Sequence, residues 1–441
     1  MRHRYPLVLA GIFLPLIAAA CAPQPIPTIP AAPPTASPAA VTTTAAAAPA
    51  TMTPAPPTAP ADESTLEEPT WPATPSVPQP PAPAHFHAGD AVQLDEIHMI
   101  DRSAGWGISG PYVLVTLDGG KTWRETTPPV DTSAGDPDRV YGAFLDAQTA
   151  WVVFSLSDQI LPEAQVWHTA DGGASWTPGA PLMHQVNAES VWAEFAALDA
   201  SNVWLLVRGV YHGAGTHFTH ELFHTGDGGL TWTSLDGEIS DDYTGMVFAD
   251  EANGLRTLQT TGAYAAAPAA YDVTADGGAT WTNVELPAPD DAPDLFTRYP
   301  YCETYQPVYV MQSAQSIRML VGCFDEYEPP KQFVSYFYSS QDGGATWTTV
   351  RLPATVQAAQ DSLLYFGQNN ALLLGRDMYL STSDGQDWVG ARPTPVNWDG
   401  QFSFSDPQYG WAVARSNGEV ALVQTTDWAR TWTVIKPVIA R

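Results

Sequence analysis

Thr116-Leu117-Asp118-Gly119-Gly120-Lys121-Thr122-Trp123 is the stretch that decides the fold, because the chain repeats its pattern. Close copies end at Trp176, Trp232, Trp281 and Trp347, and two looser copies end at Trp388 and Trp432. The seven copies follow one another at intervals of roughly 42 to 66 residues, a spacing typical of repeat architectures.

Each copy predicts a tight hairpin. Asp-Gly-Gly tolerates positive φ in a turn, and the Asp carboxylate can accept hydrogen bonds from the turn amides. The closing Trp can then fill the seam between neighbouring units. We therefore expect a structural role for the seven turn aspartates, Asp118, Asp171, Asp227, Asp276, Asp342, Asp384 and Asp427.

A second signature precedes each turn: a hydrophobic strand, a polar turn and another strand that often begins Gly-Trp, as in Phe402 to Val413. Each unit therefore has four short strands, A to D, and such units arranged radially are propeller blades. The sequence predicts an all-β, seven-bladed propeller over residues 85–441. Its blades are expected at about 90–130, 138–183, 190–236, 243–288, 305–353, 360–392 and 400–436.

The repeated turn resembles the Asp-box, also called the bacterial neuraminidase repeat. In the order of its motifs the chain is similar to the lumenal assembly factor family of photosystem II, whose blades also contain Phe-x-Asp, Gly-Trp and Asp-Gly-Gly-x-Thr-Trp. Sialidases, other glycosidases and sortilin-like receptors carry the same turn. The resemblance implies the fold, whereas unrelated activities share that fold.

The net charge and the number of cysteines argue against several classes of function and site. The formal net charge of −29 argues against nucleic-acid binding, because few basic groups are present to neutralise phosphates. Three cysteines make neither a disulfide scaffold nor a zinc motif. No cofactor or metal is predicted, and we expect a monomer.

The first residues predict export. Residues 1–21 combine Arg2 and Arg4, a short apolar run and Ala18-Ala19-Ala20-Cys21, which resembles a lipoprotein signal with lipid on Cys21. Ordinary signal cleavage that leaves an unmodified Cys21 is the alternative. Residues 22–84, rich in Pro, Ala and Thr, predict a disordered tether. The expected location is extracytoplasmic, anchored to a bacterial membrane.

Blade 5 is the candidate binding face because its connections are long. Tyr299, Tyr301 and Tyr305 precede its strands, and Asp325 and Glu326 follow its second strand. Cys302 and Cys323 fall near opposite positions if these strands pair, which predicts a disulfide in an oxidising compartment; two thiols are the alternative. A merely solvated acidic loop is the competing interpretation of this face.

Two further groups of residues are candidate sites. Arg208, Arg376 and Arg415 have similar places in three B strands and could converge on one carboxylate, as a sialidase triad does, or remain solvated at the rim. No Tyr–Glu nucleophile pair of the sialidase kind can be matched. His220 and His224 share a strand face, where metal binding competes with ordinary surface hydrogen bonding.

The favoured function is a non-catalytic scaffold that binds an unidentified envelope protein or glycan. A glycoside hydrolase, sialidase-like or other, is the alternative, with two carboxylates across a cleft. A carbohydrate-binding surface without turnover is the third possibility.

Overall fold

The computed structural model describes residues 77–440 apart from 134, 162, 213–215, 236–242, 259–267, 300, 326–331, 359–361, 368, 376 and 392–398. Cys21, most of the predicted tether, Glu326 and Arg376 therefore lie outside the described residues. Across the described ranges, no helix has both the length and the apolar character needed to cross a membrane.

The strands form seven antiparallel sheets, each ordered A-B-C-D as the chain runs. Blade 1 contains β1 (Glu96–Met99), β2 (Gly105–Ser109), β3 (Tyr112–Thr116) and β4 (Thr122–Glu125). Blade 2 contains β5 (Arg139–Phe144), β6 (Ala150–Ser155), β7 (Ala164–Thr169) and β8 (Thr177–Leu182). Blade 3 contains β9 (Ser190–Ala197), β10 (Val203–His212), β11 (Thr216–Thr225) and β12 (Thr233–Ser234). Blade 4 contains β13 (Tyr243–Phe248), β14 (Gly254–Leu258), β15 (Ala270–Thr274) and β16 (Thr282–Glu285).

The remaining blades follow the same plan. Blade 5 contains β17 (Tyr301–Tyr309), β18 (Ile317–Asp325), β19 (Gln332–Ser340) and β20 (Thr348–Arg351), with helix α1 (Leu295–Arg298) before it and the 3-10 turn η1 (Val310–Gln312) inside it. Blade 6 contains β21 (Ser362–Phe366), β22 (Asn370–Leu374), β23 (Met378–Ser381) and β24 (Val389–Ala391). Blade 7 contains β25 (Asp399–Phe404), β26 (Gly410–Ser416), β27 (Glu419–Thr425) and β28 (Thr433–Ile435).

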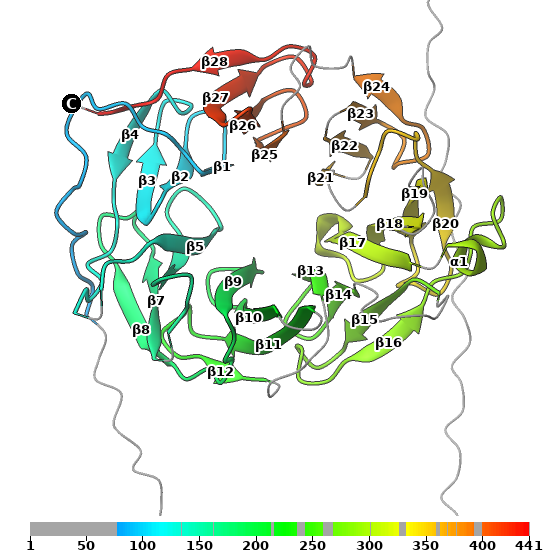
Figure 1. The fold of residues 1–441 in the computed structure, drawn as a ribbon, viewed down its shortest axis with the longest axis horizontal. Helices are drawn as coiled ribbons and strands as arrows, with labels where there is room; N and C mark the ends of the chain where they lie inside the picture. The colour runs from blue at the N-terminus through cyan, green and yellow to red at the C-terminus, as the bar shows by residue number, and fades with distance from the viewer. Residues whose placement is uncertain are drawn as a thin grey trace, which may run out of the picture. The chain divides into compact units, whose positions relative to one another are not determined.

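The seven sheets stand in a ring, with each A strand nearest the axis and each D strand at the rim (Figure 1). The predicted seven-bladed propeller of four-stranded blades is thus confirmed. One boundary was misplaced: blade 5 begins at Tyr301 rather than near 305, since β17 is longer than its sequence pattern indicated.

The ring closes at the outer edge of blade 1. The last strand, β29 (Val438–Ile439), lies parallel to β4, so this blade has five strands. Residues 89–92 pair on the other side of β29: Val92 donates its amide to Pro437 O at 3.0 Å, and Ile439 donates to Asp90 O at 2.9 Å. Residues 89–92 and the last strand therefore hold the same blade.

All A–B and C–D turns share one end of the ring, here called the turn face. In every blade the amide at the first glycine position of the C–D turn donates to a carbonyl of the A–B turn. For example, Gly119 donates to Ser103 O at 2.9 Å, and Gly343 donates to Gln315 O at 2.9 Å. The B–C and D–A connections emerge at the opposite end, the loop face.

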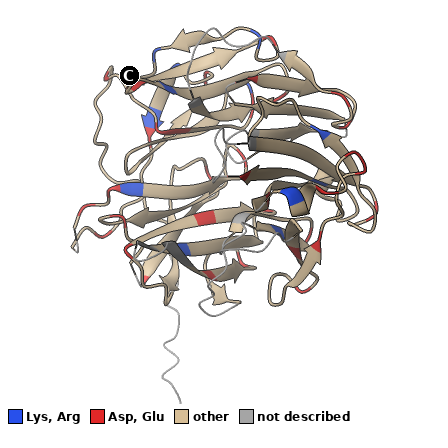
Figure 2. Cartoon of the chain, turned by 45° about the vertical axis from the view of Figure 1, so that its right-hand side comes forward, with Lys and Arg blue, Asp and Glu red and all other residues tan. Residues whose placement is uncertain are grey.

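The turn aspartates hold the turns together. Asp118 accepts hydrogen bonds from the amide of Thr122 at 2.8 Å, from the Thr122 hydroxyl at 2.8 Å and from the Thr116 hydroxyl at 3.0 Å. The same arrangement surrounds Asp171, Asp227, Asp276, Asp342 and Asp427. Many of the acidic residues lie in such turns and loops rather than within strands (Figure 2).

Asp384 does not take the capping role predicted for it. In blade 6 the amide of Asp387 donates to Ser383 Oγ at 2.9 Å, so Ser383 stands where the other turns have aspartate. Asp384 is shifted by one residue into the first glycine position, with a φ of 56°, and its amide donates to Asn369 O. The degenerate sequence of this copy hid the shift.

Tryptophans near the start of the B strands lock neighbouring blades. Trp151, Trp204 and Trp411 donate their indole N–H groups to the carbonyl oxygen of the first turn glycine in the next blade, Gly228, Gly277 and Gly119, at 2.8, 2.7 and 2.9 Å. Trp106 donates to Asp146 O at 2.8 Å instead. All four indoles are fully buried, so each seam combines apolar burial with a satisfied N–H group.

The seam between blades 5 and 6 is held by an ion pair instead of a tryptophan. Arg318 occupies in β18 the register position that these tryptophans hold. It is fully buried and binds Asp384 in a two-pronged ion pair, Nε to Oδ1 at 2.8 Å and Nη2 to Oδ2 at 2.6 Å. Its Nη1 donates to Ile317 O and Ser340 O. A Trp–glycine contact has thus been exchanged for an Arg–Asp pair at equivalent positions.

Hydrogen bonding keeps the turn carboxylates acidic. Partial burial alone would raise the pKa of Asp118, but the hydrogen bonds from Thr122 and Thr116 outweigh it and lower the pKa below its usual value. The pKa of Asp171, Asp227 and Asp427 is lowered by the same balance. At Asp276 and Asp342 the hydroxyl hydrogen bond is the main cause of the lowered pKa.

Two histidines pack against B-strand tryptophans. His168 stacks on Trp151 with ring centroids 5.3 Å apart, and His224 tilts over Trp204 at 4.6 Å. Burial lowers the pKa of both imidazoles, because desolvation penalises the charged ring.

We expect the free energy of unfolding to fall in two steps as the pH is lowered. The histidines contribute stability above their unfolded pKa of about 6.5, and this is lost as the pH falls through the folded values. The turn aspartates lose their contribution only below about pH 3.9. Urea unfolding between pH 7.5 and 3 measures both steps. The double variant His168→Gln, His224→Gln should lack the first step and keep the second; an unchanged first step would show that the assignment is wrong.

Candidate binding site on blade 5

A disulfide ties together the first two strands of blade 5. Cys302 in β17 lies directly opposite Cys323 in β18, and the two sulfur atoms are bonded, as the sequence predicted. Both cysteines are buried against the blade 4 side of the sheet, among Met319, Val321 and Tyr336. The covalent link fixes the end of the sheet that reaches the loop face.

The opposite side of these strands carries a row of three aromatic rings, here called the aromatic ladder: Tyr301, Phe324 and Phe333. They are direct cross-strand neighbours on β17, β18 and β19. Tyr301 and Phe324 stack with centroids 5.3 Å apart and an interplanar angle of 19°, and Phe324 and Phe333 with 6.0 Å and 10°. All three are half-buried, so the ladder is both ordered and accessible.

A glycine makes room beside the ladder. A side chain at Gly322 would come within 3.1 Å of the Phe333 ring, 3.3 Å of Ala358 and 3.3 Å of the Tyr305 ring. These contacts face blade 6, as Tyr305 packs with the core between blades 5 and 6. The absence of a Cβ therefore lets Phe333 and Tyr305 approach each other over the middle strand.

A buried carboxylate lies beside the ladder. Glu303 is on the same face of β17 as Tyr301 and Tyr305, two residues from each, and is 3% exposed. The Tyr305 hydroxyl donates a hydrogen bond to Glu303 Oε2. An acidic group two residues from an aromatic ring on the same strand face favours a cationic ligand group, which is attracted to the carboxylate and can make a cation–π contact with the ring.

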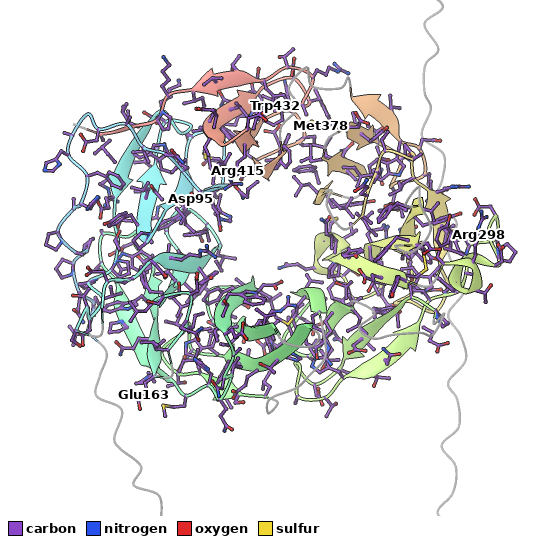
Figure 3. The ribbon with its side chains drawn as sticks, viewed as in Figure 1. Asp95, Glu163, Arg298, Met378, Arg415 and Trp432 are labelled. Atoms are coloured by element: carbon purple, nitrogen blue, oxygen red, sulfur yellow. A yellow bond between two sulfur atoms is a disulfide. The ribbon has the colours of Figure 1, made fainter. Side chains whose placement is uncertain are left out.

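The other predicted residues of blade 5 do not join this site. Tyr299 is 8% exposed and packs in the core between blades 4 and 5, so it is not part of a binding face. Its neighbour Arg298, on α1, lies at the outer periphery of the ring (Figure 3). Asp325 follows Phe324 and is half-buried, but alternation turns it to the other side of the sheet.

Two of the predicted arginines are engaged separately, one within its own blade and one at a seam between blades. Arg208 lies 3.6 Å from the Glu194 carboxylate of its own blade and over the Trp192 ring. Arg415 donates to the carbonyl oxygen of Asp95 at 2.6 Å, where blade 7 meets blade 1 (Figure 3). They share a register position, as predicted, yet each is engaged locally, and the described residues do not form a triad.

The blade 3 histidines are seam residues rather than surface ones. His220 is 1% exposed, with its ring edge-on to Tyr243 of blade 4 at 4.3 Å, and His224 lies on Trp204. The expectation of surface hydrogen bonding was therefore wrong for this pair. In the part of the chain that the structure describes, no group of three or more His, Cys, Asp or Glu side chains could hold a metal ion.

Sequence reasoning missed Phe333 and Glu303. Glu303 and Tyr301 were assigned to a loop because blade 5 was started too late. The signal was present in Tyr301, Glu303 and Tyr305, whose alternation is typical of one strand face. Phe333 needed the pairing register of β18 and β19, which a sequence does not give.

The chain shows distant likeness to several solved structures. No protein-family model and no curated protein matches this chain. It is similar to the solved structure of YCF48 bound to D1 peptide, with 19% identity, coverage of 79% of this chain and 99% of that one, and a TM-score of 0.49. For YCF48 from Cyanidioschyzon merolae the values are 16%, 78%, 97% and 0.46, and for the GH74 enzyme from Niastella koreensis 14%, 77%, 62% and 0.33. At these identities the likeness concerns the fold alone.

Proposed function

We propose that this chain is a non-catalytic binding propeller that holds a basic segment of an envelope protein on the aromatic ladder of blade 5. The observation that carries the proposal is the ladder itself: three ordered, half-buried rings, Tyr301, Phe324 and Phe333, beside the buried carboxylate of Glu303. The proposal rests on this site and not on the likeness to YCF48, whose structure contains a peptide.

The stacking geometry favours a peptide over a sugar. Sugar rings stack on exposed ring faces, but both faces of the middle ring, Phe324, are covered by Tyr301 and Phe333. The ladder offers edges and terminal faces, between which the side chains of an extended segment can insert. The net charge of −29 attracts basic partners over distance.

Removing a ladder ring should weaken binding about tenfold, since a buried aromatic anchor contributes more than about 1 kcal/mol. The test presents the labelled protein to an array of immobilised random peptides and compares wild type with Phe333→Ala and Tyr301→Ala. The control is Tyr409→Ala, a half-buried aromatic at the turn face. Equal loss in the control, or no preference for basic peptides, would refute the assignment.

Glycoside hydrolysis is the second candidate, favoured by the hydrogen bond from Tyr305 to the buried carboxylate of Glu303. No Tyr–Glu nucleophile pair could be matched in the sequence, whereas Tyr305 and Glu303 lie together on β17. Incubation with a broad glycan panel separates the candidates. Turnover that is abolished by Glu303→Gln would establish an enzyme, and no turnover by either protein supports the binding function.

Membrane attachment is part of the same proposal. Cys21 follows an apolar segment and three alanines, the pattern that supports lipidation, and residues 22–84 would hold the propeller away from the membrane. In cells fed a labelled fatty acid, the wild-type chain should take up label and sediment with membranes. Cys21→Ser should do neither; membrane retention of the unlabelled variant would point to another anchor.

A further inference from the structure

A cleft of about 290 Å³ opens on blade 2, away from the aromatic ladder. Its apolar lining includes Phe154, Leu161, Trp167 and Pro181. Leu161 is 38% exposed, which is high for a large apolar side chain beside other apolar groups. The volume is at the lower limit for small-molecule sites and suits one large side chain.

The described chain begins next to this blade. Gln79 and Trp176 form an antiparallel bridge, with N–H to O distances of 2.7 and 2.8 Å in the two directions. Trp176 immediately precedes β8, the outermost strand of blade 2, which runs on to Pro181 in the cleft lining. A chain that keeps this antiparallel direction upstream of Gln79 follows β8 toward the cleft.

The edge of β8 favours a proline-rich neighbour over another strand. Pro178 and Pro181 lack amide N–H groups, so a regular ladder cannot continue along this edge. Proline-rich segments adopt an extended conformation without internal hydrogen bonds and dock into grooves lined by aromatic residues.

The segment upstream of Gln79 has this composition. It reads Pro69-Thr70-Trp71-Pro72-Ala73-Thr74-Pro75, and Trp71 is the sole tryptophan of the Pro/Ala/Thr tether. Eight residues separate Trp71 from Gln79 and span about 25 Å at about 3.1 Å each. Pro181 lies five strand residues, about 17 Å, beyond Trp176, so Trp71 has the reach to enter the cleft.

We propose that the end of the tether docks on blade 2 of its own chain, with Trp71 in the cleft lined by Phe154, Leu161 and Trp167. The docked segment covers the exposed apolar surface and fixes the place where the tether leaves the propeller. This place is at the loop face of blade 2, because the cleft lining includes Leu161 of the B–C connection and Gly135 of the connection between blades 1 and 2.

The test uses the full chain with the photoreactive residue p-benzoylphenylalanine in place of Trp71. Irradiation should join position 71 to peptides covering 130–137 or 154–167 of the same chain, and the substitution Leu161→Asp should abolish the product. The same residue placed at Leu66 is the matched control and should give no such product. Cross-links between two chains would make a second copy the occupant and overturn the proposal.

Hydrogen exchange provides a second readout that needs no cross-link. Trp71→Ala should accelerate exchange of the peptides around Leu161 roughly tenfold, the protection expected if the effective concentration of Trp71 is about ten times its dissociation constant. Leu66→Ala should leave exchange unchanged. Identical exchange in wild type and Trp71→Ala, with no cross-link from position 71, would also overturn the proposal.

Discussion

Asp384→Ala is expected to lower the free energy of unfolding by about 3 kcal/mol, the lower end of the range for breaking a buried ion pair. The variant leaves the Arg318 guanidinium fully buried without its carboxylate. The lower end applies because the Asp384 side chain is 23% exposed, so water can partly replace it. Tyr365 and Gln341 also donate to this carboxylate and lose their acceptor.

The double variant Arg318→Trp, Asp384→Gly should recover most of that loss. It installs at the seam of blades 5 and 6 the residue pair found in the seams around Trp204 and Trp411. A tryptophan at 318 would also meet Tyr365, just as Trp204 stacks on Phe248 with centroids 3.5 Å apart.

Urea unfolding of the four proteins, wild type, Arg318→Trp, Asp384→Gly and the double variant, measures this coupling. The control is Arg102→Ala at the exposed Arg102–Asp406 pair, which should cost less than about 1 kcal/mol. If the single and double variants are destabilised additively, Arg318 does not substitute for the seam tryptophan.

Truncation after Lys436 should destabilise the ring by several kcal/mol. It removes five backbone hydrogen bonds, by which residues 437–440 are held to Lys121, Trp123 and residues 89–92. At about 1 kcal/mol each, these bonds contribute about 5 kcal/mol, and the burial of Ile439 adds about 2 kcal/mol. Ile439 is 7% exposed and packs with Val92, Trp123 and Trp411.

The truncated chain should therefore unfold at lower urea concentration, with the earliest hydrogen exchange in β3 and β4. Ile439→Val keeps the strand and should cost only about 1 kcal/mol, which calibrates the effect. A truncated protein as stable as wild type would show that the seven seams close the ring without β29.

The turn repeats predicted most of the fold because each copy contains the residues that form its turn and the tryptophan that is buried beside it. Asp118 and Trp123 predict a turn and a buried indole within eight residues. Seven such copies indicate a propeller, in which every unit can pack against two neighbours. Ring closure could not be predicted, since Val438 and Ile439 pair with β4 across the whole length of the chain.

The site was harder to predict. The sequence located blade 5 and paired Cys302 with Cys323, but it treated Tyr299 and Tyr301 alike. Tyr299 is buried in the core between blades 4 and 5, whereas Tyr301 lies in the ladder. The two tyrosines differ because β17 begins between them. Arg318 could not be recognised from the sequence, because a single arginine stands where other blades have the seam tryptophan. Its partner Asp384 was predicted to cap the turn of blade 6 instead.

The meeting of Asp90 and Ile439 at the rim of blade 1 has a topological consequence. Because the two ends of the propeller are neighbours on one sheet edge, a short peptide could join them and new ends could be cut between any two other blades. The blade at which the chain begins could then be changed without changing the folded structure, and circularly permuted chains should form the same seven-bladed ring.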